Sequence, residues 1–363
     1  MIEWLLDLDI RRDLPMYPLK FEPIYKEKIW GGRSLGRKFA RELPAGPIGE
    51  SWELSSHGDD ISVVANGSYA GLTLDKLISS NQEEILGQEL APDLNASSLF
   101  PLLVKIIDAR ENLSVQVHPD DAYAAENETG GSGKAELWYI LNAEPGARII
   151  YGLKEGVSRQ EFTEAIGTPG FARLLNQVKV KTGDYFYIPA GTVHAICKGV
   201  MLAEIQQSSD LTYRLYDWDR NDDAGNSREL HIDKAIDVIN FNHNQPAHKR
   251  TTSGNQHQAR QTSSNQHQIR SGSLLIDNSN HQVRQLKNSN FFNVELINIF
   301  KRYTGNTKNR RFYIYMNLGS EVKINYSDGS LKVAKGESFL IPAALGHYEI
   351  VGQTRLLKAF LTD

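Results

Sequence analysis

The strongest constraint on the fold of this 363-residue chain is a twelve-residue motif that occurs twice. The stretch "GDYFYIPAGTVH" at 183–194 matches "GESFLIPAALGH" at 336–347 in its first glycine, the acid after it, the phenylalanine, Ile-Pro-Ala and the final histidine, all at equal offsets. Both copies have the pattern of a turn, a short strand closed by proline, and a break before the histidine. Such self-similarity indicates one β module used twice. We therefore expect a mainly β fold built from two barrel-like modules.

Short helical stretches interrupt the predicted strands. Apolar residues at helical spacing predict helices over about Leu74–Leu90, in "DDAYAAEN", and in "LHIDKAIDVINF". A capping box, Ser158-x-x-Glu161, predicts another helix start. The stretch "AELWYILNAEPGARIIYGL" reads as a β-hairpin that turns at Glu144–Gly146.

A change in composition predicts the domain organisation. Residues 243–289 are rich in Gln, Asn, Ser and His, and "TSGNQHQAR" at Thr252–Arg260 is nearly repeated as "TSSNQHQIR" at Thr262–Arg270. Such a segment has too little apolar surface to need packing. We expect a main module over 1–242, a linker or loop over 243–289, and a degenerate copy over 290–363.

Charge and cysteine content exclude several classes of protein. The formal net charge is −4 and no predicted element carries a basic stripe, which argues against nucleic-acid binding. The single cysteine, Cys197, rules out an intrachain disulfide framework and a Cys-rich zinc knuckle. No stretch reads as a signal peptide or a membrane-spanning helix, so the expected location is the cytoplasm.

Potential metal ligands gather at the ends of predicted strands in the first module. Gln116 and His118 lie two positions apart and project from one strand face, Glu136 opens a neighbouring strand, and His194 follows the Pro-Ala-Gly break. Two imidazoles and a carboxylate, with the Gln116 amide as a possible fourth ligand, match what a zinc-type site needs. A single such histidine would more often be an ordinary residue, but the full set favours a metal centre.

Two cationic residues accompany this predicted metal centre. Lys134 is two positions before Glu136, so both side chains should point inward, and a lysine there favours an anionic partner. Arg214 is expected to alternate inward with Tyr216 on a strand lining the same cavity. A buried arginine needs a partner, either Glu204 or an oxyanion of a substrate.

The motifs together resemble a known enzyme family. They are "IWGG", "GESWELSSH", "VKIIDARENLSVQVHPDD", "GKAELWYIL", "GDYFYIPAGTVHAI" and "EIQQSSDLTYRLYDWDR", which span about residues 21–220. The chain resembles the zinc-dependent mannose-6-phosphate isomerases of the short bacterial type, in the cupin superfamily, and departs from them in the segment Asn244–Lys287.

The resemblance implies a cupin fold of double jelly-roll-like β-barrels with a small helical insertion. It also implies one zinc ion held by His118, Glu136, His194 and Gln116, a catalytic arginine at Arg214 and an active-site lysine at Lys134. The implied reaction interconverts mannose 6-phosphate and fructose 6-phosphate through an enediol. Lys134, Arg214 and Glu204 would contact the hexose phosphate.

Two other functions fit the residues. Two histidines and one glutamate also form the facial triad of non-haem iron oxygenases. A non-catalytic sugar-phosphate-binding protein would keep the basic pocket but need only part of the ligand set.

Overall fold

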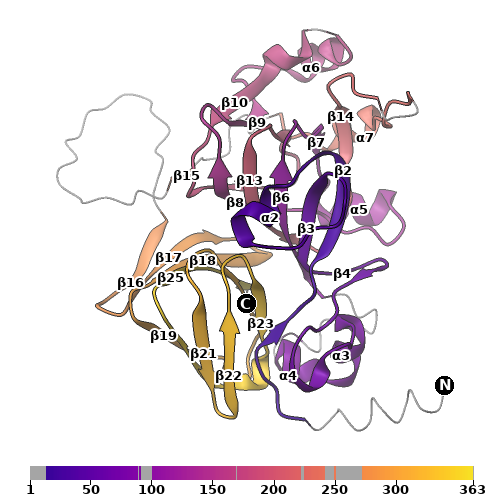
Figure 1. The fold of residues 1–363 in the computed structure, drawn as a ribbon. Helices are drawn as coiled ribbons and strands as arrows, with labels where there is room; N and C mark the ends of the chain where they lie inside the picture. Colours follow the sequence, from indigo (N-terminus) through magenta and orange to yellow (C-terminus); the bar gives the residue numbers. More distant parts are fainter. Residues whose placement is uncertain are drawn as a thin grey trace.

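Two pairs of antiparallel sheets, with a separate two-stranded sheet, form the core of the described structure (Figure 1). The structure is a computed structural model that describes residues 14–88, 90, 100–168, 170–221, 225–241, 249–250 and 272–362. The first pair forms the first barrel and the second pair the second barrel. The prediction of a mainly β protein with two barrel-like modules is confirmed. Helices in the described part are short, each seven residues or fewer.

The first barrel has a seven-stranded and a five-stranded sheet. The seven-stranded sheet runs in the order β15 (Lys249–Arg250), β11 (Asp184–Ile188), β8 (Glu136–Ala143), β13 (Val200–Gln207), β6 (Leu102–Ala109), β2 (Ile24–Gly32) and β3 (Ile48–Leu54). The five-stranded sheet runs in the order β10 (Leu175–Lys179), β9 (Arg148–Leu153), β12 (His194–Ile196), β7 (Val115–Val117) and β14 (Tyr213–Tyr216). A hydrophobic cluster that includes Trp138, Tyr151 and Phe186 packs between the two sheets.

The second barrel repeats this arrangement with a seven-stranded and a four-stranded sheet. The larger sheet runs in the order β1 (Leu19–Lys20), β23 (Ser338–Ile341), β20 (Tyr313–Asn317), β25 (Thr354–Leu361), β18 (Phe292–Ile299), β17 (His281–Asn288) and β16 (Ser273–Asp277). The smaller one runs in the order β19 (Arg302–Asn306), β24 (His347–Val351), β21 (Val322–Tyr326) and β22 (Gly329–Val333).

The sheets differ from the predicted division of the chain in two places. The first described strand, β1, pairs with β23 of the second barrel, and the Lys20 ammonium forms an ion pair with Glu337. Strands β16 and β17 lie inside the segment predicted as a linker. The composition of the segment concealed them, because buried apolar residues such as Val283 and Leu286 stand among many polar neighbours. The near-repeat at 252–270 lies outside the described residues. The boundaries at 242 and 290 therefore stay a prediction.

Two other local predictions are wrong. Strands β8 and β9 do not form a hairpin: β8 pairs with β11 and β13, whereas β9 pairs with β10 and β12, so the turn at Glu144–Gly146 crosses from one sheet to the other. The helix predicted over Leu74–Leu90 is two helices, α3 (Leu74–Ser80) and α4 (Gln82–Leu86), because the backbone leaves the helical region at Asn81.

The other predicted helices are confirmed, and one more is present. They are α5 (Asp121–Asn127), α6 (Arg159–Ala165, capped by the Ser158 hydroxyl) and α7 (Ile232–Val238). The additional helix, α2 (Ser34–Phe39), follows β2. None of the described helices has the length and apolar character that a membrane crossing requires.

The largest hydrophobic cluster joins the two barrels. It takes Tyr139 and Met201 from the back of the first seven-stranded sheet and Phe292 and Leu357 from the second, and it extends under α3 and α4. Alternation along β8 explains this: Glu136, Trp138 and Ile140 face the inside of the first barrel, and the residues between them face the second. The two barrels thus share one core.

Replacing Phe312 with alanine should strongly destabilise the protein. Its ring is fully buried in the shared core and packs on Phe100, with ring centroids 4.7 Å apart. Removing such a side chain costs about 3–5 kcal/mol. Denaturant unfolding of Phe312→Ala and of Phe300→Ala, whose ring is 47% exposed, checks this. A loss below about 1 kcal/mol for Phe312→Ala would contradict the shared core.

Candidate metal centre and cavity

Three metal-ligand side chains converge inside the first barrel. His118 follows β7, Glu136 opens β8 and His194 opens β12, and all three are buried. One ligand atom of each lies within 4.8 Å of the others. The His118 Nε2 atom is 2.9 Å from Glu136 Oε1, and the His194 Nε2 atom is 3.9 Å from Glu136 Oε2. The convergence predicted for these residues is confirmed.

Strand pairing and a glycine turn bring the two histidines together. His194 is opposite Gln116 in the β12–β7 pair. His118 follows Gln116 by two residues and therefore lies next to His194 on the same face. The turn before His194 passes through Gly191 at φ 80°, where the Gly191 amide donates to the His118 carbonyl. A Cβ atom at Gly191 would lie 2.8 Å from the Val238 carbonyl oxygen. The turn therefore requires glycine.

Backbone carbonyls select the tautomer of both histidines. The Leu211 carbonyl is 2.7 Å from His118 Nδ1, and the Thr192 carbonyl is 2.9 Å from His194 Nδ1. Both Nδ1 atoms therefore carry hydrogen, and the Nε2 lone pairs face Glu136. Burial and the Lys134 charge lower the pKa of His118 to about 3, and burial also lowers the pKa of His194. Both rings are neutral, as metal ligands must be.

This arrangement places two electron-rich atoms in contact. A neutral His118 Nε2 without hydrogen and a carboxylate Oε1 are 2.9 Å apart; His118 Nε2 has no hydrogen-bond donor among the described residues, and the Lys134 ammonium approaches only the carboxylate oxygen. Two such acceptors repel each other unless a cation lies beside both. The donor set, two imidazoles and one carboxylate, is one that zinc and related divalent ions take. The residues therefore fit a bound metal ion.

Glu136 is held as a carboxylate by its neighbours. Burial alone would raise its pKa, but Lys134 and His118 outweigh burial and keep the pKa well below its usual range. The Lys134 ammonium is 3.1 Å from Glu136 Oε1, and the Trp138 indole donates to Oε2 at 2.9 Å. The prediction that Lys134 and Glu136 point inward together is confirmed.

Gln116 is at the edge of the same group. Its amide nitrogen is 3.2 Å from His194 Nε2, and the Ser114 hydroxyl is 3.4 Å from its amide oxygen. A half-turn of the amide exchanges the two ends and presents the oxygen toward the histidines. Its role as a fourth ligand stays a prediction.

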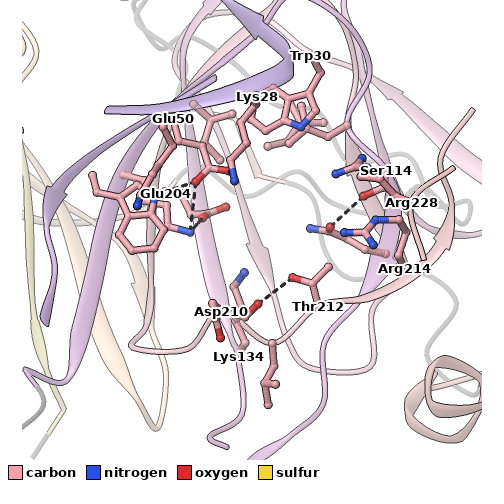
Figure 2. Close-up of a pocket in the computed structure, with 18 of the residues that line it drawn as sticks. Lys28, Trp30, Glu50, Ser114, Lys134, Glu204, Asp210, Thr212, Arg214 and Arg228 are labelled. Carbon is pink, nitrogen blue, oxygen red and sulfur yellow. Dashed lines mark hydrogen bonds and ion pairs between the residues drawn. The ribbon is translucent and has the colours of Figure 1, made fainter. Parts of the chain in front are cut away.

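A cavity of about 510 Å³ opens beside this group, and Figure 2 shows its two ends. Glu50, Glu204 and Lys28 lie on one side, and Ser114, Arg214 and Arg228 on the other. Lys134, Gln116, Arg214 and Glu204 all line the cavity, and their roles toward a metal ion or a substrate stay predictions. The cavity is polar at both ends, which suits a ligand rich in oxygen.

Arginines gather at one end of the cavity. The Arg214 guanidinium donates to the Glu229 carbonyl at 2.7 Å, and burial and the nearby Arg228 lower its pKa. Arg228 and Arg220 share one carboxylate, Asp217, so this end keeps excess positive charge. The prediction that Tyr216 faces the cavity together with Arg214 is wrong. The register of β14 shifts after Arg214, and the Tyr216 ring packs behind the sheet.

The opposite wall includes charged residues that sequence reasoning missed. Lys105 lies between Glu50 and Glu204, 4.0 and 3.8 Å from their oxygens, and its ammonium faces the Trp52 ring. Burial lowers the pKa of Lys105. The missed signal was the single charge of Lys105 within the apolar run "PLLVKII", together with Glu50 two positions before Trp52.

Glu204 is buried beside a second carboxylate. Its oxygen accepts from the same Trp138 indole that binds Glu136, at 2.9 Å. Burial and the nearby Glu136 charge raise the pKa of Glu204 to about 7. A carboxyl group with such a pKa can exchange a proton near neutral pH.

The second barrel does not repeat the ligand set. Strand registers place Tyr313 at the position of Glu136 and Lys308 at that of His118. His347, the counterpart of His194, is exposed and lies 2.8 Å from the Asn306 amide nitrogen. Aromatic side chains fill the interior, where the Tyr315 and Tyr348 hydroxyls are 2.6 Å apart. The described positions that correspond to His118 and Glu136 thus carry neither a histidine nor a carboxylate in the second barrel.

Comparison with known proteins identifies the class of protein that this fold and site define. Residues 18–145 match the catalytic domain of type I phosphomannose isomerases, and residues 282–361 match the mannose-6-phosphate isomerase cupin domain. A putative mannose-6-phosphate isomerase of Bacillus subtilis is 34% identical over 95% of this chain and 99% of its own length. The Streptococcus mutans mannose-6-phosphate isomerase is 48% identical over 61% of this chain and 67% of its own length.

Solved structures agree. The crystal structure of the mannose 6-phosphate isomerase from Bacillus subtilis superposes with a TM-score of 0.81 at 33% identity, covering 95% of this chain and 99% of that one. A phosphomannose isomerase from Salmonella typhimurium shares the fold, with a TM-score of 0.70 at 16% identity. This chain belongs to the type I mannose-6-phosphate isomerase family, and the cupin fold is confirmed.

The raised pKa of Glu204 predicts a specific dependence of stability on pH in chelator-treated protein. Below pH 4.5 the carboxyl group is protonated in both states, and between 4.5 and about 7 only the unfolded state loses the proton. Glu204 should therefore lower the unfolding free energy by about 1–3 kcal/mol as pH rises through this window, against the rise that His118 and His194 contribute through their lowered pKa values. The Glu204 contribution is the difference between the urea-unfolding pH curves of the unaltered protein and of Glu204→Gln, and the unaltered protein should lose stability relative to the variant as pH rises. Parallel pH curves for the two proteins would contradict the raised pKa.

Proposed function

We propose that this chain is a metal-dependent isomerase that interconverts mannose 6-phosphate and fructose 6-phosphate. Membership of the mannose-6-phosphate isomerase family supports the reaction class. The observation that carries the metal dependence is the contact of His118 Nε2 with Glu136 Oε1, two acceptors that need a cation beside them.

The proposed ion is zinc, held by His118, Glu136 and His194 with the Gln116 amide oxygen as a fourth ligand. Neutral imidazoles whose Nδ1 atoms donate to backbone carbonyls are typical zinc ligands. A bound divalent cation would polarise the sugar oxygens on C1 and C2 by Lewis-acid action. Lys134 keeps Glu136 ionised and, from the cavity wall, can orient a substrate oxygen.

The two ends of the cavity support different parts of the reaction. The isomerisation takes a proton from C2 of the aldose, forms the C1–C2 enediol and returns a proton to C1, while the carbonyl moves to C2. Glu204 is the proposed base, because its pKa of about 7 suits proton transfer near neutral pH. Arg214 lies opposite Gln116 in the β14–β7 pair, where it can stabilise negative charge on the enediol oxygens.

The excess positive charge at the arginine end supports a phosphorylated substrate. Arg220 and Arg228 share the single Asp217 carboxylate, and Arg214, Arg228 and Ser114 line the cavity at this end. Guanidinium groups suit phosphate oxygens. We place the phosphate of the hexose at this end.

Removing one proposed ligand should abolish both metal binding and activity. His118→Ala should lose bound zinc and reduce mannose 6-phosphate turnover at least about a hundredfold, as expected for loss of a ligand. The matched control is His347→Ala, the counterpart in the second barrel, which should keep both. Zinc content is measured by elemental analysis and turnover by a coupled assay, before and after a chelator and with zinc restored. Retained zinc and activity in His118→Ala would sink the assignment.

Arg214→Lys should lower kcat by about a hundredfold at unchanged zinc content, because one ammonium cannot reproduce the guanidinium contacts to developing charge. Steady-state kinetics of this variant and of Arg159→Lys, an exposed site 58% accessible, give the comparison. A raised KM at unchanged kcat would instead assign Arg214 to phosphate binding.

A further inference from the structure

A two-residue strand pair at the rim of the cavity contacts the segment that supports His118. The pair consists of β4 (Ser56–His57) and β5 (Asp60–Ile61), joined by a turn. His57 Nε2 is 3.1 Å from Asp210 Oδ1, and Asp60 on the neighbouring strand pairs with Lys26 of β2. The hairpin is therefore fastened to the first barrel on one side and to Asp210 on the other.

Asp210 belongs to a short segment without regular structure, Ser208–Thr212, that lies between β13 and β14. The segment is tied at Ser209, whose hydroxyl donates to the Ser132 carbonyl at 2.8 Å and whose carbonyl accepts from the Gln206 amide at 2.5 Å. The next residue, Asp210, has the His57 contact. The residue after that, Leu211, supplies the carbonyl that accepts from His118 Nδ1 at 2.7 Å.

We propose that His57 is a positioning residue for the metal centre. It fixes the position of Asp210 and thereby that of the Leu211 carbonyl, the next residue. This carbonyl keeps His118 in the tautomer with hydrogen on Nδ1, so that Nε2 is directed at the proposed metal position. His57 does not line the cavity itself and contacts none of the proposed ligands; its partner Asp210 does line the cavity, and the next residue supplies the carbonyl that His118 binds. The inference rests on the metal site proposed above.

Two observations favour this role over a surface ion pair without consequence. The first is the place of Asp210 in the chain: its contact with His57 lies between the anchored Ser209 and the Leu211 carbonyl, and it adds to the longer hydrogen bond, 3.4 Å, from the Leu211 amide to the Ser209 hydroxyl. The His57 hydrogen bond is the largest cause that lowers the pKa of Asp210, so the contact favours the carboxylate form. Partners that orient a metal-bound histidine change metal affinity about 10–100-fold when removed.

The test compares zinc affinities of metal-free protein, measured by competition with a chromophoric chelator. His57→Ala should weaken zinc binding by about tenfold, near the lower end of that range. His57→Gln, whose amide can still donate to Asp210, should recover most of the loss. The control is His281→Ala, a half-buried histidine of the second barrel that contacts the Tyr303 ring, and it should bind zinc like the unaltered protein.

A double-variant cycle tests the route of the effect. If His57 acts through Asp210, then Asp210→Asn and His57→Ala should weaken zinc binding by less together than the product of their separate effects. With saturating zinc, turnover of His57→Ala should return close to that of the unaltered protein, which separates a lost metal from a lost catalytic group.

Two outcomes would overturn the inference. One is a zinc affinity of His57→Ala within twofold of that of the unaltered protein. The other is a double variant whose loss of zinc affinity equals the product of the losses of the two single variants. Failure of the unaltered protein to bind zinc is a different result, because it would remove the proposed metal site itself rather than the role of His57. Thermal unfolding of each variant confirms that the affinities compare folded proteins.

Discussion

The buried charge of Glu136 is the constraint on which the rest of the site depends. An ionised carboxylate taken out of water is costly unless partners of opposite charge or hydrogen-bond donors surround it. Lys134 supplies the charge, Trp138 supplies a donor, and the two histidine Nε2 atoms face the remaining oxygens without hydrogens of their own. The protein alone leaves this arrangement incomplete, and a divalent cation would complete it. The strands β7, β8 and β12 must therefore end where they do, because a one-residue slip would turn each ligand to the other face.

The second barrel shows the same scaffold without that constraint. Where Glu136 opens β8, Tyr313 opens β20, and the interior is closed by stacked Tyr315 and Phe339 rings, 5.0 Å between centroids. Aromatic and aliphatic side chains pack this interior, whereas the first barrel has a cavity lined with charged groups. One backbone pattern thus gives a polar site in one copy and a packed core in the other, and the difference lies in a few side chains at corresponding positions.

The sequence predicted the candidate metal ligands because each of them belongs to a short, recognisable spacing pattern along the chain. Gln116 and His118 are two apart on one strand, Lys134 and Glu136 likewise, and His194 follows a Pro-Ala-Gly break. Residues whose role depends on strands far apart in the chain had no such signal: Lys105 approaches Glu50 only because β6 lies between β13 and β3. The β8–β9 hairpin was predicted wrongly for a related reason. Alternation identifies a strand but does not say which neighbour it pairs with, and a corner between sheets has the same turn residues as a hairpin.

The position of β1 has a consequence for how the protein is made. Leu19 and Lys20 lie near the start of the chain, yet their strand partner, Leu340–Phe339, is near its end. On the ribosome the N-terminal residues are synthesised first, so β1 has no strand partner until nearly all of the other strands have been synthesised. The back of the first seven-stranded sheet waits as well, because its apolar covering belongs to the second barrel. The barrel that holds the candidate metal centre is therefore synthesised before most of the apolar residues that cover the back of its larger sheet.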